Sequence, residues 1–461
     1  MTSSEVAAQA DTYARNAHYR RPWYWYDWAN SAFVTTTGTV LFGPYITAVA
    51  KKAACPGGGD AACTTTLSFF GVPLSPGSVA PYTVTVATIL AAVVLMFVGA
   101  VADRSPRPAR LLGVFAWAGA AAASAMFFVA GANWQLGVVL MVLATVAFAS
   151  SQAVYDSLLC RIAAPDERDT VSSRGWGLGY LGGGLLLALN LAFITVGDSI
   201  GVDQAMAARI SMLSAGVWWA VFTIIPVGGM WRLRGVERPE VAREAGAVGG
   251  SLRQLRDTFG ELRQFPQTML FLLAYLFFND GIQTVIGSAS LYGSEELGFK
   301  TEQLMTLILM VQFVAFGGAL LFGRVAGRFG AWRTILASLG LWSVAVAIAF
   351  FVPRGAFTTF MVLGVLIGLV LGGSQALSRS LYSQLIPKDR EAEFFSFYQA
   401  MERGTSWFGT LTFGLVHQFT GSYRWAIIAL LAFFVVGGYL LSRVDVRQGI
   451  VDAGNEVPRV V

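Results

Sequence analysis

The segment SQAVYDSLLCRIAAPDER, which begins at Ser151, returns later in the chain as SQALSRSLYSQLIPKDR, which begins at Ser374. The two segments lie at an offset of 223 in residue number. A second similar pair, GAVADRSPR from Gly99 and GRVAGRFGAWR from Gly323, lies at an offset of 224. Two pairs that agree on nearly one offset indicate an internal repeat of about half the chain. The fold is therefore predicted to have two similar halves.

The composition is that of a membrane protein. Hydrophobic residues make up 55% of the 461 residues, charged residues only 13%, and the mean hydropathy is +0.59. This leaves too little polar surface for a soluble protein of this size. Apolar stretches of about 20 residues, enough to cross a ~30 Å hydrocarbon layer, predict twelve spans. Because lipid tolerates no unpaired backbone groups and the alternation of a membrane β-barrel is missing, these spans are predicted to be helices. They cover residues 24–49, 81–102, 109–130, 135–159, 174–197, 207–231, 267–291, 303–326, 333–352, 357–382, 393–417 and 424–442.

The repeat and the charge pattern divide the chain into three parts. They predict an N-terminal six-helix bundle over residues 1–231, a cytoplasmic linker over 232–265 and a C-terminal six-helix bundle over 266–461. The linker is rich in Arg, Glu and Gly and includes SLRQLRDTFGELRQF, which is predicted to form one surface helix.

The basic residues predict the orientation. An even number of helices places both termini on one side, and 26 of the 32 Lys and Arg fall in the termini, the loops of that side and the adjoining helix ends. By the positive-inside rule both termini are expected in the cytoplasm, in a bacterial inner membrane. The segment before Trp23 lacks the apolar core and cleavage site of a signal peptide, so the first helix is expected to remain. The six exceptions to the bias are Lys51, Lys52, Arg209, Lys300, Arg354 and Arg424.

Several other classes of protein are excluded. No basic block with interleaved aromatic residues occurs, so no nucleic-acid partner is expected. The two histidines, His18 and His417, are too few and too far apart for an H-E-x-x-H zinc site, so no metal is expected. No P-loop, dinucleotide fingerprint or nucleophile elbow is present, and neither a cofactor nor an enzymatic activity is predicted.

Two of the three cysteines could form a disulfide. Cys55 and Cys63 bracket PGGGDAA in the long loop after the first predicted helix. In an oxidising periplasm the pair could staple this loop, and the alternative is two free thiols in a glycine-rich segment.

A parallel repeat of six and six helices with these turns resembles the major facilitator superfamily. The superfamily's signature between the second and third helices is G-x-x-x-D-R-x-G-R-R. The first half departs from it at Pro106 and Pro108, which replace a glycine and a basic residue, and the second half has Gly327 in place of the acid. The matching residues are Gly99, Asp103, Arg104 and Arg107 in the first half and Gly323, Arg328, Gly330 and Arg333 in the second.

Four further segments narrow the resemblance. YDWANSAF, VSSRGWGLGYLGG, NDGIQTV and GGSQALSRS together look like the "unknown major facilitator" family, whose eukaryotic relatives are the autophagy-related vacuolar amino-acid effluxers. The resemblance extends over all twelve predicted helices. It implies an all-α major facilitator fold, transport by alternating access and, by kinship, amino-acid efflux.

In this superfamily the first helix of each three-helix unit lines the central cavity, and each of these four helices carries one ionisable residue here. These residues are Asp27, Asp156, Asp280 and Arg379. Asp156 and Arg379 are equivalent in the repeat, so an acid is expected to oppose a base. The pair could be a gate, a structural bridge or a direct contact to substrate.

Asp280 and Asp27 are the other two intramembrane acids. Asp280 lies about 13 residues, or ~20 Å, into its predicted helix, too deep to snorkel to the surface. Its neighbour Gln283 adds hydrogen-bonding capacity, and the site could couple transport to protons or could be a packed carboxyl group. YDWANSAF and FNDGIQTV place Asp27 opposite Asp280 at an offset of 253, and Asp27, Asn30 and Ser31 can share a polar stripe toward a cavity or a neighbouring helix.

The eleventh predicted helix carries Glu402 and Arg403. Adjacent residues on a helix point about 100° apart, so the two are expected to contact different neighbours near the interface of the halves, in a structural role. Two rows of glycines at four-residue spacing are expected to let helices approach closely. These rows are Gly175, Gly179 and Gly183, and Gly364, Gly368 and Gly372.

The sequence therefore predicts a secondary active transporter of a small organic solute, with an amino acid as the favoured substrate, proton coupling and efflux as a possible direction. The expected partners are this solute, a proton and the lipid bilayer, and the chain is expected to be monomeric. One alternative is an exporter of hydrophobic metabolites, drugs or lysolipids. Another, of a different class, is a non-transporting membrane sensor or scaffold.

Overall fold

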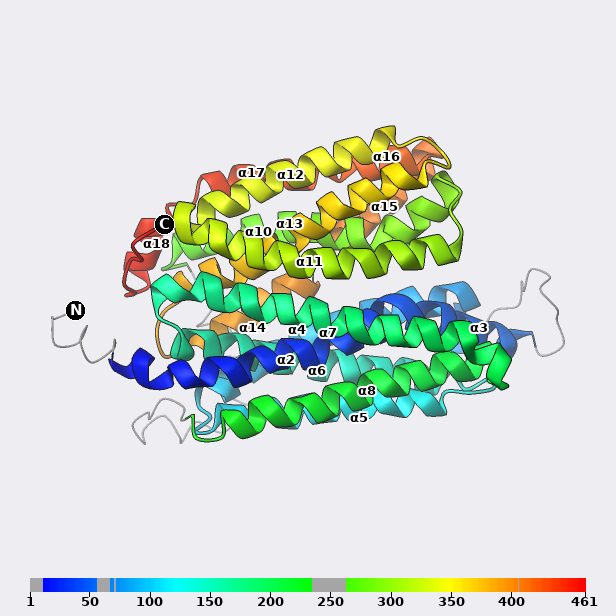
Figure 1. Ribbon diagram of the computed structural model, residues 1–461, viewed down its shortest axis with the longest axis horizontal. Helices are drawn as coiled ribbons and strands as arrows, with labels where there is room; N and C mark the ends of the chain where they lie inside the picture. Colours follow the sequence, from blue (N-terminus) through cyan, green and yellow to red (C-terminus); the bar gives the residue numbers. More distant parts are fainter. Residues whose placement is uncertain (1–10, 56–66, 70–71, 234–262, 405) are drawn as a thin grey trace.

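The computed structural model of the chain describes residues 11–55, 67–69, 72–233, 263–404 and 406–461. Two layers of long helices with similar axis directions make up the molecule, one built before residue 234 and the other after residue 262 (Figure 1). The prediction of an all-α membrane protein is confirmed, because eleven of the described helices are long and apolar enough to cross a bilayer.

The helices of the first half are η1 (Ala17–Tyr19), α2 (Arg20–Ala32), η2 (Phe33–Leu41), α3 (Phe42–Ala54), η3 (Pro76–Ser78), α4 (Val79–Asp103), α5 (Pro108–Ala125), η4 (Met126–Phe128), α6 (Trp134–Ile162), η5 (Pro165–Glu167), α7 (Arg168–Gly197), η6 (Asp198–Ile200) and α8 (Gln204–Gly229). A two-stranded antiparallel hairpin, β1 (Leu67–Phe69) and β2 (Val72–Leu74), follows α3.

The helices of the second half are α10 (Pro266–Leu291), η8 (Tyr292–Glu296), α11 (Thr301–Phe329), α12 (Ala331–Phe351), α13 (Phe357–Gln384), α14 (Glu391–Gly404), α15 (Ser406–Thr420), α16 (Tyr423–Ala429), α17 (Leu431–Ser442) and α18 (Val446–Asp452). The predicted span 393–417 is found as α14 and α15, on either side of residue 405. The first span is longer than predicted and is helical from Asp11 to Ala54.

Both glycine rows allow close helix packing, as predicted. On α13 a Cβ added at Gly368 would lie 3.0 Å from the Val311 carbonyl oxygen of α11, and at Gly372 it would overlap the Ala315 carbonyl. On α7 a Cβ at Gly179 would lie 2.8 Å from Ser31 Oγ of α2. Close backbone approach through small residues is the usual basis of helix association in membranes.

The halves pack along several helix pairs, chiefly α7 with α11 and α4 with α14 (Figure 1), and also α7 with α13 and α6 with α14. The C-terminal segment after α18 adds a further link. Asn455 Nδ2 donates to the carbonyl oxygens of Gln384 and Ile386 in the second half, at 2.9 and 2.7 Å. The Arg459 backbone N–H donates to Asp166 Oδ1 of the first half at 2.7 Å. This segment therefore crosses from one half to the other.

Three predictions stay predictions. The predicted surface helix lies almost wholly in residues 234–262, outside the described residues, and so does most of the predicted linker over 232–265 between the two bundles. Cys55 is disulfide-bonded, but Cys63 lies outside the described residues, so the predicted pairing is not settled.

Candidate functional site

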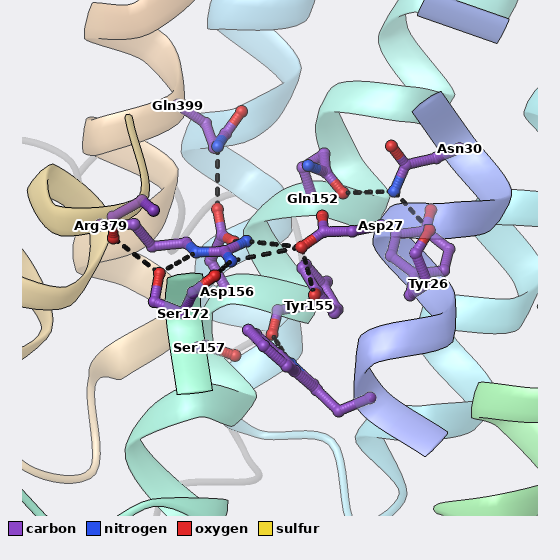
Figure 2. Close-up of polar contacts among 12 residues, drawn as sticks. Tyr26, Asp27, Asn30, Gln152, Tyr155, Asp156, Ser157, Ser172, Arg379 and Gln399 are labelled. Carbon is purple, nitrogen blue, oxygen red and sulfur yellow. Dashed lines mark hydrogen bonds and ion pairs between the residues drawn. The ribbon is translucent and has the colours of Figure 1, made fainter. Parts of the chain in front are cut away.

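The candidate site is an ion cluster buried between the two halves (Figure 2). Asp27 of α2, Asp156 of α6 and Arg379 of α13 are 4%, 1% and 1% exposed. Arg379 Nη1 lies 3.1 Å from Asp156 Oδ1, and Arg379 Nη2 lies 3.2 Å from Asp27 Oδ2. The ion pair predicted from the repeat is therefore present, and Asp27 joins it as a third member. We call these three residues the charge cluster.

Helix packing brings Asp27 into reach of the guanidinium. A Cβ added at Gly175 of α7 would lie 2.7 Å from Asp27 Oδ2 and 3.1 Å from Arg379 Nη2. Only a residue without a side chain fits there, so the glycine row of α7 positions the carboxylate. Tyr155, next to Asp156 on α6, donates its hydroxyl to the same Asp27 oxygen at 2.7 Å.

The remaining nitrogen of Arg379 and the second oxygen of Asp156 are also hydrogen-bonded. Arg379 Nε donates to Ser172 Oγ at 2.9 Å and Nη2 donates to the Ser172 carbonyl at 3.0 Å. Gln399 Nε2 of α14 donates to Asp156 Oδ2 at 2.9 Å. Figure 2 shows Arg379 of the second half bonded to side chains of α2, α6 and α7 of the first half, and Gln399 of α14 bonded to Asp156. A buried arginine is tolerated when charge and hydrogen bonds compensate it in this way.

Aromatic rings cover the arginine. The guanidinium carbon lies 4.9 Å from the ring centre of Trp23, 5.4 Å from that of Tyr155 and 5.5 Å from that of Trp176. Trp23 and Tyr155 stack at 4.3 Å. Cation–π contacts of this kind strengthen when water is excluded, so these rings stabilise the positive charge.

Glu402 and Arg403 extend the polar network along α14. Glu402 accepts from Tyr275 of α10 at 3.2 Å and from Gln399 at 3.3 Å. The Arg403 guanidinium carbon lies 4.4 Å from the ring centre of Phe148, in the first half. Arg403 Nε also donates to Gln399 Oε1 at 3.3 Å, so both residues contact Gln399 of their own helix. Their contacts to other helices differ, as predicted from their adjacency.

Two amide pairs show how the halves correspond. Asn30 donates to Gln152 at 3.2 Å in the first half, and Gln375 donates to Asn279 at 2.9 Å in the second. Gln152 and Gln375 are related by the repeat offset of 223, whereas Asn30 and Asn279 are related by an offset of 249. The sequence offset of 253 for the first helices is therefore wrong by four residues, about one turn. In this register Asp280 corresponds to Ser31, not to Asp27.

Asp280 is not part of the charge cluster. Its Oδ2 accepts from the Gly409 backbone N–H at 2.8 Å. Gln283 lies nearly one turn further along α10 and is partly buried. The residues predicted to bind substrate or to couple transport therefore lie in two separate places. Asp27 and Arg379 are in the charge cluster, and Asp280 lies elsewhere on α10.

The loop signature also links the halves. Asp103, the last residue of α4, accepts the backbone N–H groups of Ala392 and Glu393 at 2.9 Å each, which caps the N-terminus of α14. Gly99 packs against the same turn, because an added Cβ would lie 2.6 Å from Glu393 Cα. In the second half, Gly323 packs against Ser173 of α7. The basic residues of the signature are exposed; they are Arg104, Arg107, Arg328 and Arg333.

The polar contacts between the halves gather at one end of the molecule. Arg168 donates to the Ser383 carbonyl at 2.7 Å, and Ser380 donates to Asp169 at 2.5 Å. Together with the caps at Asp103, these bonds lie toward the helix ends where α2 begins and the C-terminus lies (Figure 1). The described conformation is therefore fastened at this end.

Sequence reasoning missed Ser172, Tyr155 and Gln399 as members of the site. Ser172 lies in VSSRGWGLGYLGG and Tyr155 in SQAVYDSLLCRIAAPDER, two segments already singled out. For Tyr155, the available signal was its position directly before Asp156. Gln399 had no signal beyond being polar in an apolar span.

Two bundles of long helices arranged in this way are the major facilitator fold, and solved structures of similar fold agree. The proton:xylose symporter XylE is 14% identical with a TM-score of 0.67, over 94% of this chain and 96% of that one. A bacterial homologue of the iron transporter ferroportin in an outward-facing state is 14% identical with a TM-score of 0.64, over 93% and 98%. These likenesses concern the fold alone.

The sequence model described as "Vacuole effluxer Atg22 like" matches residues 16–454, and the chain belongs to this family. It is 29% identical over 440 residues to the uncharacterized MFS-type transporter YxiO of Bacillus subtilis, covering 95% of this chain and 97% of the relative. It is 25% identical to autophagy-related protein 22-1 of Penicillium rubens, covering 84% and 78%. The protein is thus an integral membrane transporter and not an enzyme, as predicted.

Proposed function

We propose that the protein carries amino acids across the membrane by proton-coupled alternating access. The charge cluster supports this substrate class. One guanidinium and two carboxylates meet at 3.1 and 3.2 Å in a buried place between the halves. An amino acid at neutral pH carries one carboxylate and one ammonium group, which are complementary to Arg379 and to the two acids.

The charge balance supports a cation requirement. With both carboxylates ionised, one guanidinium leaves the charge cluster with one excess negative charge. Uncompensated buried charge is costly, so the cluster favours a bound cationic group in any conformation that admits one. The ammonium group of the substrate would supply this charge.

The same contacts support a gating role. Asp27 and Asp156 belong to the first half and Arg379 to the second, so the halves cannot separate at this end unless the ion pairs break. A substrate whose carboxylate replaces one acid at Arg379 would compensate the broken pair. Binding would then lower the barrier to opening, which is the coupling that alternating access requires.

The charge pattern supports the location. The bias of Lys and Arg favours cytoplasmic termini in a bacterial inner membrane. In that orientation the end fastened by the charge cluster faces the cytoplasm.

Reconstitution tests this function. The purified protein in liposomes is given a panel of labelled amino acids, with and without an imposed pH gradient. Flux of at least one amino acid that rises with the gradient is expected, and Arg379→Gln should abolish it. Arg354→Gln removes an exposed arginine outside the site and should transport as the unchanged protein does. Flux of labelled lysolipid with no amino-acid flux would overturn the proposal.

A further inference from the structure

A second buried carboxyl group, on α10, has no counter-charge. Asp280 is 1% exposed, and its Oδ2 accepts one backbone N–H, from Gly409. Its Oδ1 is buried with no hydrogen-bond partner in the described part of the chain. Thr284, one turn further along the same face of α10, has a buried hydroxyl group that also lacks a partner there.

These two oxygens meet at the same small residue. A Cβ added at Gly409 of α15 would overlap Thr284 Oγ1 and would lie 3.1 Å from Asp280 Oδ1. The absent side chain of Gly409 therefore leaves the space into which both oxygens point. We call Asp280, Thr284 and Gly409 the α10 site.

The repeat shows that the first half lacks this acid. In the register set by the amide pairs, Asp280 and Thr284 correspond to Ser31 and Thr35. Thr35 Oγ1 donates to the Ser31 carbonyl, so its hydroxyl is satisfied within the helix. Gly183 of α7 packs against both residues, as Gly409 does in the second half. The packing is thus repeated, but of these two pairs of equivalent residues only Asp280 and Thr284 provide a carboxyl group and an unpartnered hydroxyl.

Charged side chains on the helices around α10 are engaged elsewhere. On α13, Arg379 is bonded to Asp27 and Asp156. On α14, Glu402 accepts from Tyr275, and Arg403 lies over Phe148.

The other neighbours of α10 also bring no cation to Asp280. The helix α17 carries no charged residue, and the only titratable side chain of α15 is His417, which stacks on Tyr423 two turns beyond Gly409. On η8, Glu296 pairs with Arg424 beyond the end of α10, and Glu295 adds only negative charge. Asp445, Arg447 and Asp452 around α18 lie near the start of α10, where Asp445 is bonded to Gln267. The α10 site therefore contains a carboxyl group that none of the described cations neutralises.

We propose that Asp280 is the binding site of the coupling proton, separate from the charge cluster that binds the solute. This inference rests on the proposed function, because it assigns the proton of that transport cycle to a residue. A proton on the carboxyl group would remove the buried charge, which the single hydrogen bond from the Gly409 backbone N–H does not balance. The α15 backbone packs closely at Gly409, so the α10 site has only two side-chain oxygens and little space. Such a site favours a proton over a hydrated metal ion.

Asp280→Asn in proteoliposomes is the first test. The amide keeps the shape but cannot release a proton, so amino-acid accumulation driven by a pH gradient should be lost. Exchange of labelled for unlabelled amino acid, which moves no net proton, should continue. Gradient-driven accumulation in Asp280→Asn at normal protein levels would overturn the proposal. Loss of exchange as well, in a correctly folded variant, would also overturn it, because Asp280 would then belong to solute binding.

Two matched pairs keep the proposal testable if Asp280→Asn does not fold. Thr284→Val removes the hydroxyl and should weaken gradient-driven accumulation. Thr284→Ser keeps the hydroxyl and should leave this accumulation unchanged. Gly409→Ala should impair coupling, because its methyl group enters the α10 site. Gly414→Ala lies on the same helix with open space around it and should be neutral. Equal coupling in all four variants would overturn the assignment.

Two controls separate this inference from the proposed function. If the unchanged protein shows no gradient-driven flux of any amino acid, the proposed function fails. If the unchanged protein transports and Asp280→Asn does so equally, only the proton assignment fails. A sodium gradient at equal pH completes the design, because sodium-driven accumulation that depends on Asp280 would replace the proton by a metal cation and overturn the proposal.

Discussion

The ion pair between Asp156 and Arg379 can be tested by a double-mutant cycle. Arg379→Gln leaves two buried carboxylates unpaired and should destabilise the protein by about 3–5 kcal/mol, the cost of breaking a buried pair. Asp156→Asn leaves Arg379 bonded to Asp27, so it should cost about 1.5–3 kcal/mol, the value of one charge-assisted hydrogen bond. The double variant has one orphan carboxylate fewer than Arg379→Gln alone. The double variant should therefore lose less free energy of unfolding than the sum of the two single variants, by roughly 1–3 kcal/mol.

The free energies can be measured by unfolding the purified protein in mixed micelles of a mild detergent and SDS, followed by tryptophan fluorescence. The pair Arg424–Glu296 is the matched control. It has a similar separation, 3.0 Å, but its side chains are 25% and 21% exposed, so its coupling should stay below about 1 kcal/mol. Additive losses for Asp156 and Arg379, within about 0.5 kcal/mol, would refute the claim that the two side chains stabilise each other.

Three further predictions concern orientation, capping and packing. Asp452→Cys should react with impermeant thiol reagents only from the cytoplasmic side and Ser199→Cys only from the outside; the reverse pattern would refute the orientation. Asp103→Ala and Asp203→Ala each remove a helix cap and should each cost about 0.5–2 kcal/mol in the same unfolding assay. Only Asp103→Ala should also change transport rates, because only its cap joins the two halves, and equal rates would contradict this. Gly175→Ala should reduce amino-acid flux at normal protein levels, since its methyl group would lie 2.7 Å from a carboxylate oxygen of the charge cluster.

The sequence was sufficient to predict the helices and the central ion pair. Hydropathy identifies spans because each must be apolar over the full thickness of a bilayer. The equivalence of Asp156 and Arg379 followed from the repeat, since residues related by a pseudo-twofold axis face each other when they lie near that axis. These inferences depend only on periodicity and offset, which the sequence carries directly.

The position of Asp27 could not be derived in the same way. The repeat had to be aligned across a long loop, and a shift of four residues keeps nearly the same face of a helix toward its neighbours. The residue pattern therefore cannot distinguish the offset of 253 from that of 249. The hydrogen bonds of Asn30 and Asn279 decide between them.

Ser172 and Gln399 were missed for a related reason. Serine and glutamine are common in the interiors of transporter helices, and their contribution depends on which helix of the other half lies opposite. That contact is made between residues more than 200 apart. Only the packing of the two halves reveals it.

The C-terminal segment works as a tether of fixed length. Its anchors, Asn455 on the second half and Arg459 on the first, are four residues apart, and four extended residues span at most ~14 Å. Any separation of the two anchor points beyond that length must release one end. The Arg459 end is the weaker one, because the side chains of Arg459 and Asp166 are 92% and 47% exposed, whereas Asn455 holds two main-chain carbonyls. The tail would therefore travel with the second half when the fastened end opens, and Asp166 would then lose its bond to Arg459.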